Sequence, residues 1–459
     1  MNLAHEIFKA YDIRGVVDQS LTVEVTRLVG QALGTTALEA GMKTMVVGRD
    51  GRLSGPKLSD ALAQGMLDSG IDVIDIGQVP TPVLYYATYE LGTGSGVEVT
   101  GSHNPPEYNG LKMMIDGVTL SGEAIQTLKN RIIDSDLRVA ETRGTLSTEP
   151  MLDRYCERIT SDLSLDRPMK VVIDCGNGVA GAIAPKVYKD LGCEVVELFC
   201  EVDGNFPNHH PDPSQAENLV DLINAVQETG AEFGLAFDGD GDRLGVVTPD
   251  GQIIWPDRQM ILFARDVLSR NPGAQIIYDV KCTRTLPAAI EAAGGQPLMW
   301  KTGHSFIKAK LKETGAALAG EMSGHLFFKE RWYGFDDGIY AGARLCELLS
   351  KLDKSPTEVF AALPDTINTP ELRINFEEGE HYKFIDAFQL SAQFDNGELH
   401  TIDGVRVDYE GGFGLVRASN TTPMLIMRFE ADSEALLRSI QSEFRREMRK
   451  IDAELTLPF

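Results

Sequence analysis

The sequence has few cysteines and no long apolar segment. Six cysteines occur among 459 residues, and none forms a Cys-x-x-Cys pair, which argues against a zinc ribbon and favours buried reduced thiols. No segment approaches the roughly 20 apolar residues of a membrane span. The N-terminal MNLAHEIFKAYDIRG contains no apolar stretch long enough for a signal peptide. We therefore expect a cytoplasmic protein without a membrane partner.

Positive charge is also scarce. The chain has 43 Lys and Arg against 68 Asp and Glu, a net charge of −25. Nucleic acids and anionic membranes need a positive face, so both are poor candidate partners. A local cluster of cations could still bind a small anion. Hydrophobic residues make up 43% of the chain, which is ordinary for a globular protein, and the length corresponds to about three or four domains.

A strand–helix–strand–helix–strand pattern occurs three times. Short β-branched runs in TMVVGRDGR, KVVIDCGNG and QIIYDVKCT begin the three units. Each unit ends on a short strand that enters a polar loop, in SGVEVTGS (95–102), FGLAFDGDGD (233–242) and GAALAGEMSG (315–324). This alternation is typical of α/β proteins. We expect three tandem, similar α/β domains, with ligand groups at the ends of their strands.

The pattern changes from about residue 370. LRINFE, ELHTIDGVRVDYEGG and PMLIMRFEAD indicate antiparallel strands, and an amphipathic helix follows over 434–450. Asp432 and Ser433 are its candidate N-caps. The segments 134–149 and 355–371 resemble linkers. The expected domains are 1–145, 146–252, 253–366 and a C-terminal α+β domain over 367–459.

The loop Thr100-Gly101-Ser102-His103-Asn104-Pro105 follows the third strand of the first unit. Its glycine would let a phosphate or a metal approach the backbone. Ser102 can be an exposed nucleophile, or a turn residue like its neighbours. No Gly-x-Ser-x-Gly surrounds it, so a hydrolase elbow is not supported.

The loop Asp238-Gly239-Asp240-Gly241-Asp242-Arg243 alternates three carboxylates with two glycines. Hard cations such as Mg²⁺ prefer oxygen ligands of this kind, and three close acids without a cation would repel one another. An EF-hand fails because Arg243 and Pro249 stand where Gly and Glu are needed. The sequence predicts a metal site with open positions, with a solvated acidic turn as the alternative.

Two further loops carry polar groups. Glu321 and Ser323, two residues apart in Gly-Glu-Met-Ser-Gly-His, could both face sugar hydroxyls, and His304 lies upstream. Arg417-Ala-Ser-Asn-Thr-Thr-Pro423 offers a guanidinium with hydroxyl and amide donors, a pattern suited to a phosphate cradle. Each could also be an ordinary polar turn. Together with Arg14 and Lys112, the four loops fit phosphoryl transfer to and from a polyol.

FKAYDIRG, TGSHNP, DGDGDR, GEMSGH and RASNTTP occur in this order nearly end to end. In this the chain resembles the α-D-phosphohexomutase superfamily, and GEMSGH is similar to the bacterial phosphomannomutase/phosphoglucomutase branch. The resemblance implies three similar α/β domains with mixed sheets, and a smaller C-terminal domain like a TATA-box-binding protein unit, around a central cleft. It implies a cytoplasmic enzyme that interconverts hexose 1- and 6-phosphates, of mannose and also of glucose, through a phosphoserine and a hexose 1,6-bisphosphate.

The resemblance also implies roles for individual residues. Ser102 would carry the phosphoryl group and, with Asp238, Asp240 and Asp242, bind Mg²⁺. The other implied catalytic residues are His103, Lys112, Arg14 and Arg243. The implied sugar-binding residues are Glu321, Ser323, His304 and His325. The implied phosphate-binding residues are Arg417, Ser419, Asn420, Thr421, Tyr11 and Lys281.

The remaining expectations concern cofactors, partners and alternatives. The expected cofactor is Mg²⁺, with glucose 1,6-bisphosphate or mannose 1,6-bisphosphate as activator. The expected partner is a phosphosugar substrate, and the chain is expected to be a monomer or homodimer. Lys112, His103 and His325 are all candidates for the general base. Phosphoglucosamine mutase, a non-catalytic phosphosugar-binding protein and a metal-dependent phosphatase are the alternative functions.

Overall fold

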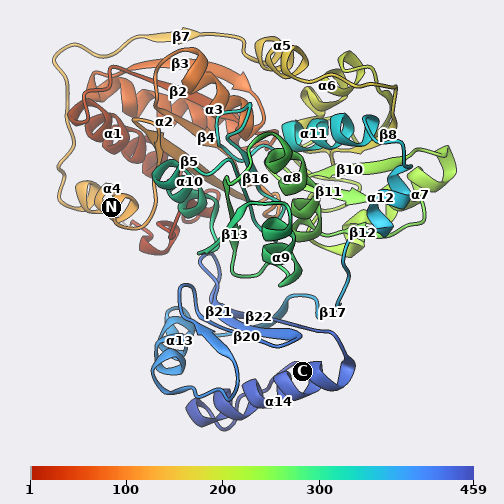
Figure 1. The fold of residues 1–459 in the computed structure, drawn as a ribbon. Coiled ribbons are helices and arrows are strands. Elements are labelled where there is room, and N and C mark those ends of the chain that lie inside the picture. The colour runs from red at the N-terminus through yellow and green to blue at the C-terminus, as the bar shows by residue number, and fades with distance from the viewer. Residues whose placement is uncertain (1–2) are drawn as a thin grey trace. The chain divides into compact units, whose positions relative to one another are not determined.

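The computed structural model describes residues 3–459 and contains four β-sheets (Figure 1). The chain divides into two compact units. Unit 1 contains the residues up to Pro256 together with Lys308–Glu313 and Ser323–Ala362, and unit 2 contains Asp257–Ile307, Thr314–Met322 and Leu363–Phe459.

The first sheet, in unit 1, has seven strands in the order β1-β5-β4-β2-β3-β7, with β6 paired to β5. Its strands are β1 (Ile13–Val16), β2 (Thr44–Arg49), β3 (Asp72–Gln78), β4 (Gly96–Val99), β5 (Tyr108–Ile115), β6 (Val118–Thr119) and β7 (Leu146–Thr148). Its helices are the short η1 (His5–Ile7), α1 (Val23–Glu39), α2 (Gly55–Ser69), α3 (Thr81–Glu90) and α4 (Glu123–Ile133).

The second sheet, also in unit 1, has the order β12-β11-β10-β8-β9. Its strands are β8 (Lys170–Asp174), β9 (Glu194–Leu198), β10 (Phe233–Phe237), β11 (Leu244–Val247) and β12 (Ile253–Ile254). The helical segments are α5 (Leu152–Asp162), η2 (Val179–Ala182), α6 (Ala184–Asp190), η3 (Ala216–Leu219) and α7 (Val220–Thr229). Three later elements belong to the same unit: β16 (Leu326–Phe328), α11 (Gly338–Ser350) and α12 (Pro356–Ala361).

The third sheet, in unit 2, is built on β13 (Gln275–Asp279), which pairs in parallel with β14 (Gln296–Trp300) and with β15 (Leu318–Gly320). The helices of this part of the chain are α8 (Pro256–Arg270), α9 (Thr285–Ala292) and α10 (His304–Thr314).

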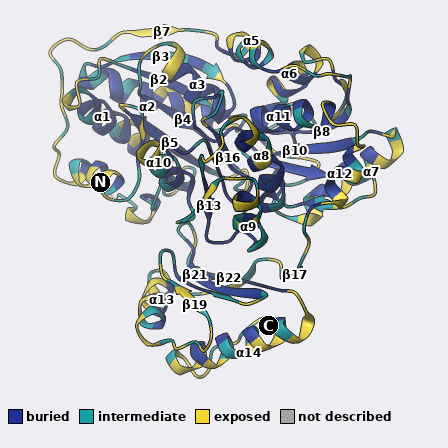
Figure 2. Ribbon diagram, in the orientation of Figure 1, coloured by how far each residue is buried: buried dark blue, intermediate teal, exposed yellow. Residues whose placement is uncertain are grey.

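The three α/β segments share one strand arrangement. In each, the first strand is central and pairs in parallel with the second on one side and the third on the other: β3-β2-β4, β9-β8-β10 and β14-β13-β15. Every residue of β4 and β10 is buried, as expected for inner strands covered on both faces (Figure 2). The expected threefold repetition of an α/β unit with mixed sheets is confirmed.

The fourth sheet, in unit 2, is antiparallel, in the order β17-β22-β21-β20-β19, with β18 also paired to β22. Its elements are β17 (Ile367–Asn368), β18 (Leu372–Asn375), α13 (Glu380–Ser391), β19 (Glu398–His400), β20 (Val405–Tyr409), β21 (Gly412–Ala418), β22 (Met424–Ala431) and α14 (Glu434–Ile451). Ser433 caps α14 by accepting a hydrogen bond from the Leu436 amide. Leu437, Phe444 and Met448 face the core of this domain.

Some elements differ from the sequence-based expectation. The supposed linker 134–149 contains β7, which pairs in parallel with β3. All three residues of β7 are exposed, so no alternation of buried and exposed positions marks it as a strand. The segment 355–371 contains α12 and β17, and α13 and β21 had not been resolved from the sequence as separate elements.

All six cysteines are free, and all but Cys200 are buried, as the apolar sequence around several of them predicted. Among the described residues, none of the helices combines the length and the hydropathy that crossing a bilayer requires.

Substitution of Phe444 is expected to destabilise the C-terminal domain. The ring is fully buried, with its centroid 4.6 Å from that of Phe394 and 5.4 Å from that of Phe429. Phe444→Ala should lower the free energy of unfolding by about 3–5 kcal/mol, since it leaves a cavity, whereas Leu390→Ala, at a side chain 90% exposed, should change it by less than about 0.5 kcal/mol. Urea unfolding measures both, and equal midpoints would contradict the assignment of the core.

Candidate active site

Ser102 lies in the loop that follows β4 and is almost completely buried. Its backbone has φ +48°, in the left-handed region that a non-glycine residue seldom adopts. Its Oγ donates a hydrogen bond of 2.9 Å to Asp238 Oδ2 and lies 3.1 Å from His103 Nδ1. The loop therefore holds this hydroxyl in one place, against a carboxylate of the next sheet.

The loop after β10 supplies three carboxylates, Asp238, Asp240 and Asp242, all fully buried. Each offers an oxygen within 4.8 Å of the others. Gly239 allows this loop to approach the serine loop, because a Cβ there would lie 2.3 Å from the Ser102 carbonyl oxygen. The alternation of Asp and Gly thus brings the three carboxylates close together and leaves space at Gly239 for the serine loop to pack against this loop.

Two cations compensate this negative charge. Lys112, on β5, donates a hydrogen bond of 2.7 Å to Asp240 Oδ2 and another to Asp242 Oδ2. The backbone amide of Arg243 donates to Asp238 Oδ1 over 3.1 Å, and the guanidinium Nε lies 3.8 Å from Asp238 Oδ2. Ionised acids at such depth need partners of this kind.

The pKa values of the carboxylates diverge. Burial and repulsion from Asp240 and Asp242 raise the pKa of Asp238 well above its usual value. Burial also acts on Asp242, but the charge of Lys112 outweighs it, with help from His325, and lowers the pKa of Asp242 well below the usual range. Such opposite shifts in one cluster are typical of functional sites.

Two histidines border the cluster. Burial, and then the charges of Arg243 and Arg14, lower the pKa of His103 well below its usual value. His325 Nε2 lies 3.3 Å from both Asp242 Oδ1 and Arg243 Nε. The lowered pKa favours the neutral imidazole of His103 over its protonated form.

The carboxylate cluster fits a divalent metal ion. Asp240 Oδ1 is buried and has no hydrogen-bond partner among the described residues. Three carboxylates with their oxygens close together, and a serine hydroxyl bonded to one of them, form an all-oxygen donor set. Hard cations such as Mg²⁺ are bound by such sets.

The N-terminal motif lies against the serine loop. Arg14, on β1, donates to Asp12 Oδ2 over 2.6 Å and also to the side chain of Asn104. Tyr11 is near enough to Arg243 for its phenol group, when ionised, to contribute to the raised pKa of that guanidinium, after the larger effects of Asp238, Asp212 and Asp242. The structure thus brings Tyr11 and Arg14 to the Ser102 cluster.

Unit 2 holds a second group of the predicted residues. Glu321, at the end of β15, accepts a hydrogen bond of 2.5 Å from the Gly303 amide, next to the buried His304 that begins α10. Lys281, after β13, donates to Glu371 over 2.6 Å. Although burial acts in the opposite direction, this ammonium lowers the pKa of Glu371 to about 2.

The RASNTTP loop belongs to the same group. Arg417, on β21, donates to Asp403 Oδ2 over 3.0 Å, and the Thr302 amide donates to the same oxygen over 2.9 Å. Asn420 Nδ2 bonds the Thr302 carbonyl over 3.3 Å, and the Thr421 amide bonds Ser419 Oγ over 3.3 Å. The bonds through Asp403 and Asn420 tie the RASNTTP loop to Thr302, in the loop that precedes His304, and the Thr421 bond lies within the RASNTTP loop itself.

Glu321 and Ser323, predicted as a pair, fall into different groups. Ser323 belongs to unit 1, where its Oγ lies 2.9 Å from His325 Nδ1. The group in unit 1 is Tyr11, Arg14, Ser102, His103, Lys112, Asp238, Asp240, Asp242, Arg243, Ser323 and His325. The group in unit 2 is Lys281, His304, Glu321, Arg417, Ser419, Asn420 and Thr421.

Comparison with known proteins decides the family. Four family models described as phosphoglucomutase/phosphomannomutase domains match this chain: α/β/α domain I over 5–138, domain II over 153–251, domain III over 255–367 and the C-terminal domain over 369–447. The chain belongs to the phosphoglucomutase/phosphomannomutase family.

Individual relatives agree. A phosphomannomutase/phosphoglucomutase of Pseudomonas putida is 57% identical over 457 residues, covering 100% of this chain and 98% of that protein. A phosphoglucomutase of Neisseria meningitidis is 56% identical and covers 97% of each. The crystal structure of a family protein from Burkholderia thailandensis superposes with a TM-score of 0.95 at 54% identity, covering 100% of both chains. The expected superfamily, its bacterial branch, the four-domain α/β architecture and the assignment as a mutase are confirmed.

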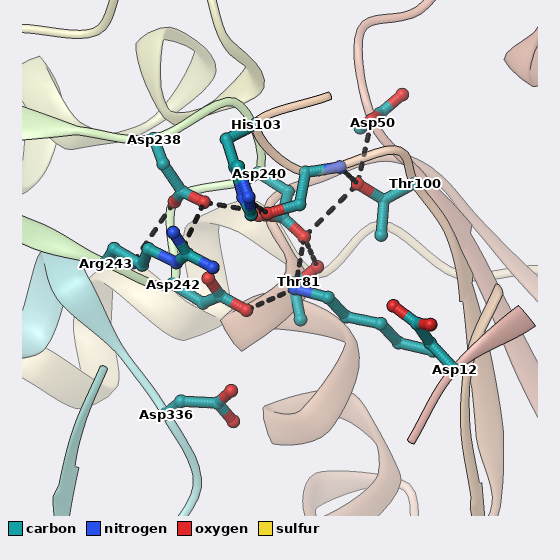
Figure 3. A network of polar contacts seen from close by, with 12 residues as sticks. Asp12, Asp50, Thr81, Thr100, His103, Asp238, Asp240, Asp242, Arg243 and Asp336 are labelled. Carbon is teal, nitrogen blue, oxygen red and sulfur yellow. Dashed lines mark hydrogen bonds and ion pairs between the residues drawn. The ribbon is translucent and has the colours of Figure 1, made fainter. Parts of the chain in front are cut away.

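Several residues at this mutase site were not singled out from the sequence. Thr81, which begins α3, donates to Asp240 Oδ2 over 2.6 Å, and Thr100 Oγ1 lies 2.8 Å from Asp50 Oδ2 and 3.2 Å from Asp240 Oδ2 (Figure 3). Asp50 and Arg52 follow β2 in Gly-Arg-Asp-Gly-Arg. The position of Asp50 and Arg52 in the loop that follows a β-branched strand was the one sequence signal that could have marked them as candidate site residues.

Glu98 is a further buried group of the mutase. It lies on β4 opposite Lys112 of β5 and opposite Gly48 of β2, and a Cβ at Gly48 would come within 2.3 Å of Glu98 Oε2. Both carboxyl oxygens are buried and without a hydrogen-bond partner in the described chain. Burial, with repulsion from Asp50 and Asp240, raises the pKa of Glu98 well above its usual value.

Replacing this carboxyl is expected to stabilise the protein in a pH-dependent way. The folded state keeps the Glu98 proton above about pH 4.5, where the unfolded chain releases it, so wild-type stability falls as pH rises from there toward the raised pKa. Glu98→Met removes this loss and should stabilise the protein by more than about 1 kcal/mol at pH 8, and by less at pH 5. Urea unfolding at the two pH values tests this. The exposed Glu228→Met is the control, and a gain independent of pH would contradict the reasoning.

Proposed function

We propose that this chain is a phosphosugar mutase that reversibly interconverts the 1- and 6-phosphates of mannose and of glucose. The observation that carries the proposal is the hydrogen bond from Ser102 Oγ to Asp238, within a buried cluster of three carboxylates and two cations. A hydroxyl held there can carry a phosphoryl group whose charge the site compensates. The names of the relatives agree with this activity.

The reaction consists of two transfers. The bond between phosphorus and Ser102 Oγ breaks as a free hydroxyl of the hexose phosphate binds the phosphorus, giving a hexose 1,6-bisphosphate. Ser102 then accepts the other phosphoryl group, and the second hexose monophosphate leaves. A bisphosphate such as glucose 1,6-bisphosphate or mannose 1,6-bisphosphate activates the enzyme, because it phosphorylates Ser102.

Each transfer moves one proton. In the first transfer the attacking sugar hydroxyl loses the proton and the released Ser102 Oγ gains it; in the second, the Ser102 hydroxyl loses it and the released sugar oxygen gains it. Of the three candidate bases, His103 and His325 can accept this proton, and His103 Nδ1 adjoins Ser102 Oγ. Although burial acts in the opposite direction, the charges of Asp240 and Asp242 raise the pKa of Lys112, so that this side chain stays an ammonium and serves as a cation. Arg14 and Arg243 supply positive charge near the transferred group. Mg²⁺, held by Asp238, Asp240, Asp242 and Ser102, would neutralise charge developing on the phosphoryl oxygens.

Residues of the other loops bind the part of the substrate that does not react. In this proposal Glu321, Ser323, His304 and His325 bind sugar hydroxyls, and the phosphate that is not transferred is bound by Arg417, Ser419, Asn420, Thr421, Tyr11 and Lys281. Carboxylate and hydroxyl groups can bond vicinal hydroxyls in either orientation of the ring. The proposed domains, 1–145, 146–252, 253–366 and 367–459, would each contribute one loop to a cytoplasmic enzyme acting as a monomer or homodimer.

Loss of the serine hydroxyl is expected to abolish turnover. With Mg²⁺ and a trace of glucose 1,6-bisphosphate, purified protein should convert mannose 1-phosphate and glucose 1-phosphate to the 6-phosphates faster than it converts glucosamine 6-phosphate. Ser102→Ala should lower kcat by about 10³-fold or more, since no group carries the phosphoryl. Ser442→Ala, at an exposed position of α14, is the control. Near-normal turnover by Ser102→Ala, or net release of inorganic phosphate, would overturn the proposal.

Removal of one carboxylate is expected to weaken the metal. Asp240→Asn keeps the shape of the side chain but removes negative charge from the donor set, so the affinity for Mg²⁺ should fall by about 10-fold or more. Titration calorimetry of the unreacted protein measures this without turnover. Asp221→Asn, at an exposed position in the first turn of α7, should leave the affinity unchanged. Equal affinities of wild type and Asp240→Asn would exclude Asp240 as a ligand.

A further inference from the structure

Arg52 lies between β2 and α2, with a fully buried side chain. All five of its guanidinium N–H groups have an acceptor. Nε donates to Asp50 Oδ2 over 3.1 Å, Nη1 to the carbonyls of Pro105 and Tyr108 over 2.6 and 3.0 Å, and Nη2 to the carbonyls of Ser102 and Asn104 over 2.8 and 2.6 Å. Four of the five acceptors are thus main-chain carbonyl oxygens, three in the serine loop and one, that of Tyr108, at the start of β5.

The loop is wrapped closely around this guanidinium. A Cβ at Gly101 would lie 2.4 Å from Arg52 Cζ, so a larger residue there would displace the side chain. The ring of Phe206 covers the guanidinium, with its centroid 5.2 Å from Cζ. The serine loop and the Arg52 guanidinium are therefore packed closely against each other.

Bonding through carbonyls has a consequence for Ser102. Its φ of +48° is unfavourable for a non-glycine residue and persists only where surrounding contacts enforce it. The bond from Arg52 to the Ser102 carbonyl is one such contact. Because the peptide unit is planar and trans, the His103 N–H on the same unit points away from the guanidinium.

Arg52 is also linked to the carboxylate cluster through Asp50. Asp50 Oδ2 accepts from the Gly101 amide over 3.1 Å as well as from Arg52, and lies 2.8 Å from Thr100 Oγ1. Thr100 Oγ1 in turn accepts from the Ser102 amide over 2.8 Å. Both ends of the serine residue, its amide and its carbonyl, are thus held by one bonded network.

We propose that Arg52 is a positioning residue for phosphoryl transfer, which fixes Ser102 Oγ against Asp238 without touching the substrate. This inference rests on the proposed role of Ser102 as phosphoryl carrier. Lysine cannot replace it, because a single ammonium has three donors and cannot span four carbonyls. A small displacement of a reacting atom is enough to lower the rate by up to about 10²-fold.

The test compares Arg52→Lys with wild type and with Arg27→Lys, a control on α1 whose side chain is 56% exposed. Arg52→Lys should lower kcat by about 10–100-fold while KM for mannose 1-phosphate changes by less than about threefold, because the substrate contacts are untouched. The phosphorus NMR resonance of phosphorylated Ser102 should shift or broaden in Arg52→Lys only. A merely stabilising role for Arg52 would leave kcat and this resonance unchanged in folded protein.

A second variant keeps the guanidinium and moves it. In Gly101→Ala the added methyl group would clash with Arg52 Cζ and displace the guanidinium, so kcat should fall as in Arg52→Lys. If Arg52→Lys does not fold, Gly101→Ala by itself tests the inference. Wild-type kcat and an unchanged resonance in a folded variant would overturn the inference. If Ser102→Ala itself retained full activity, the proposed function would fail instead, so the two failures are distinguishable.

Discussion

The constraint on which the site depends is the burial of three carboxylates within 4.8 Å of one another. Unpaired, each ion at such depth would cost several kcal/mol. The surrounding fold supplies the compensation: the ammonium of Lys112, the amide and guanidinium of Arg243, and the Thr81 hydroxyl at the start of α3. A bound metal ion would offset more of the negative charge of the three carboxylates, which the groups of the protein already offset in part.

The repeated α/β arrangement explains why these groups meet. In both sheets of unit 1 the third strand of the repeat, β4 or β10, is buried on both faces and ends in a functional loop. Strand register then fixes the position of a cation, because the pairing of β4 with β5 places Lys112 opposite Glu98. The same pairing leaves a carboxyl without a partner, so the arrangement that orients the lysine lowers stability at Glu98.

The sequence was informative where a signal is local. The β-branched strands, the alternating Asp and Gly, and the Ser433 cap all occur within a few residues, and the structure has them as predicted. Thr81 and Asp240 are 159 positions apart, and nothing in their neighbourhoods indicates that they meet. Lys112 and Asp240 are 128 positions apart, and the family resemblance, not a local pattern, assigned both to one site. Arg52 was missed for a related reason: its partners are carbonyl oxygens, which every residue has and no sequence pattern displays. The strand β7 escaped because its residues are all exposed.

An acidic chain can still bind phosphorylated substrates, because the cations of the site are buried side chains paired with carboxylates. Lys112, Lys281 and Arg417 are each buried and held by a carboxylate, as Arg52 is by Asp50. Pairing orients each cation and reduces its long-range field. The net charge of −25 is a sum over the whole chain and does not describe the groups at any one site. Buried pairs are screened by salt much less than exposed ones. The positive groups needed by a phosphoryl-transfer site are thus kept in place by some of the same acidic residues that make the chain as a whole so negative.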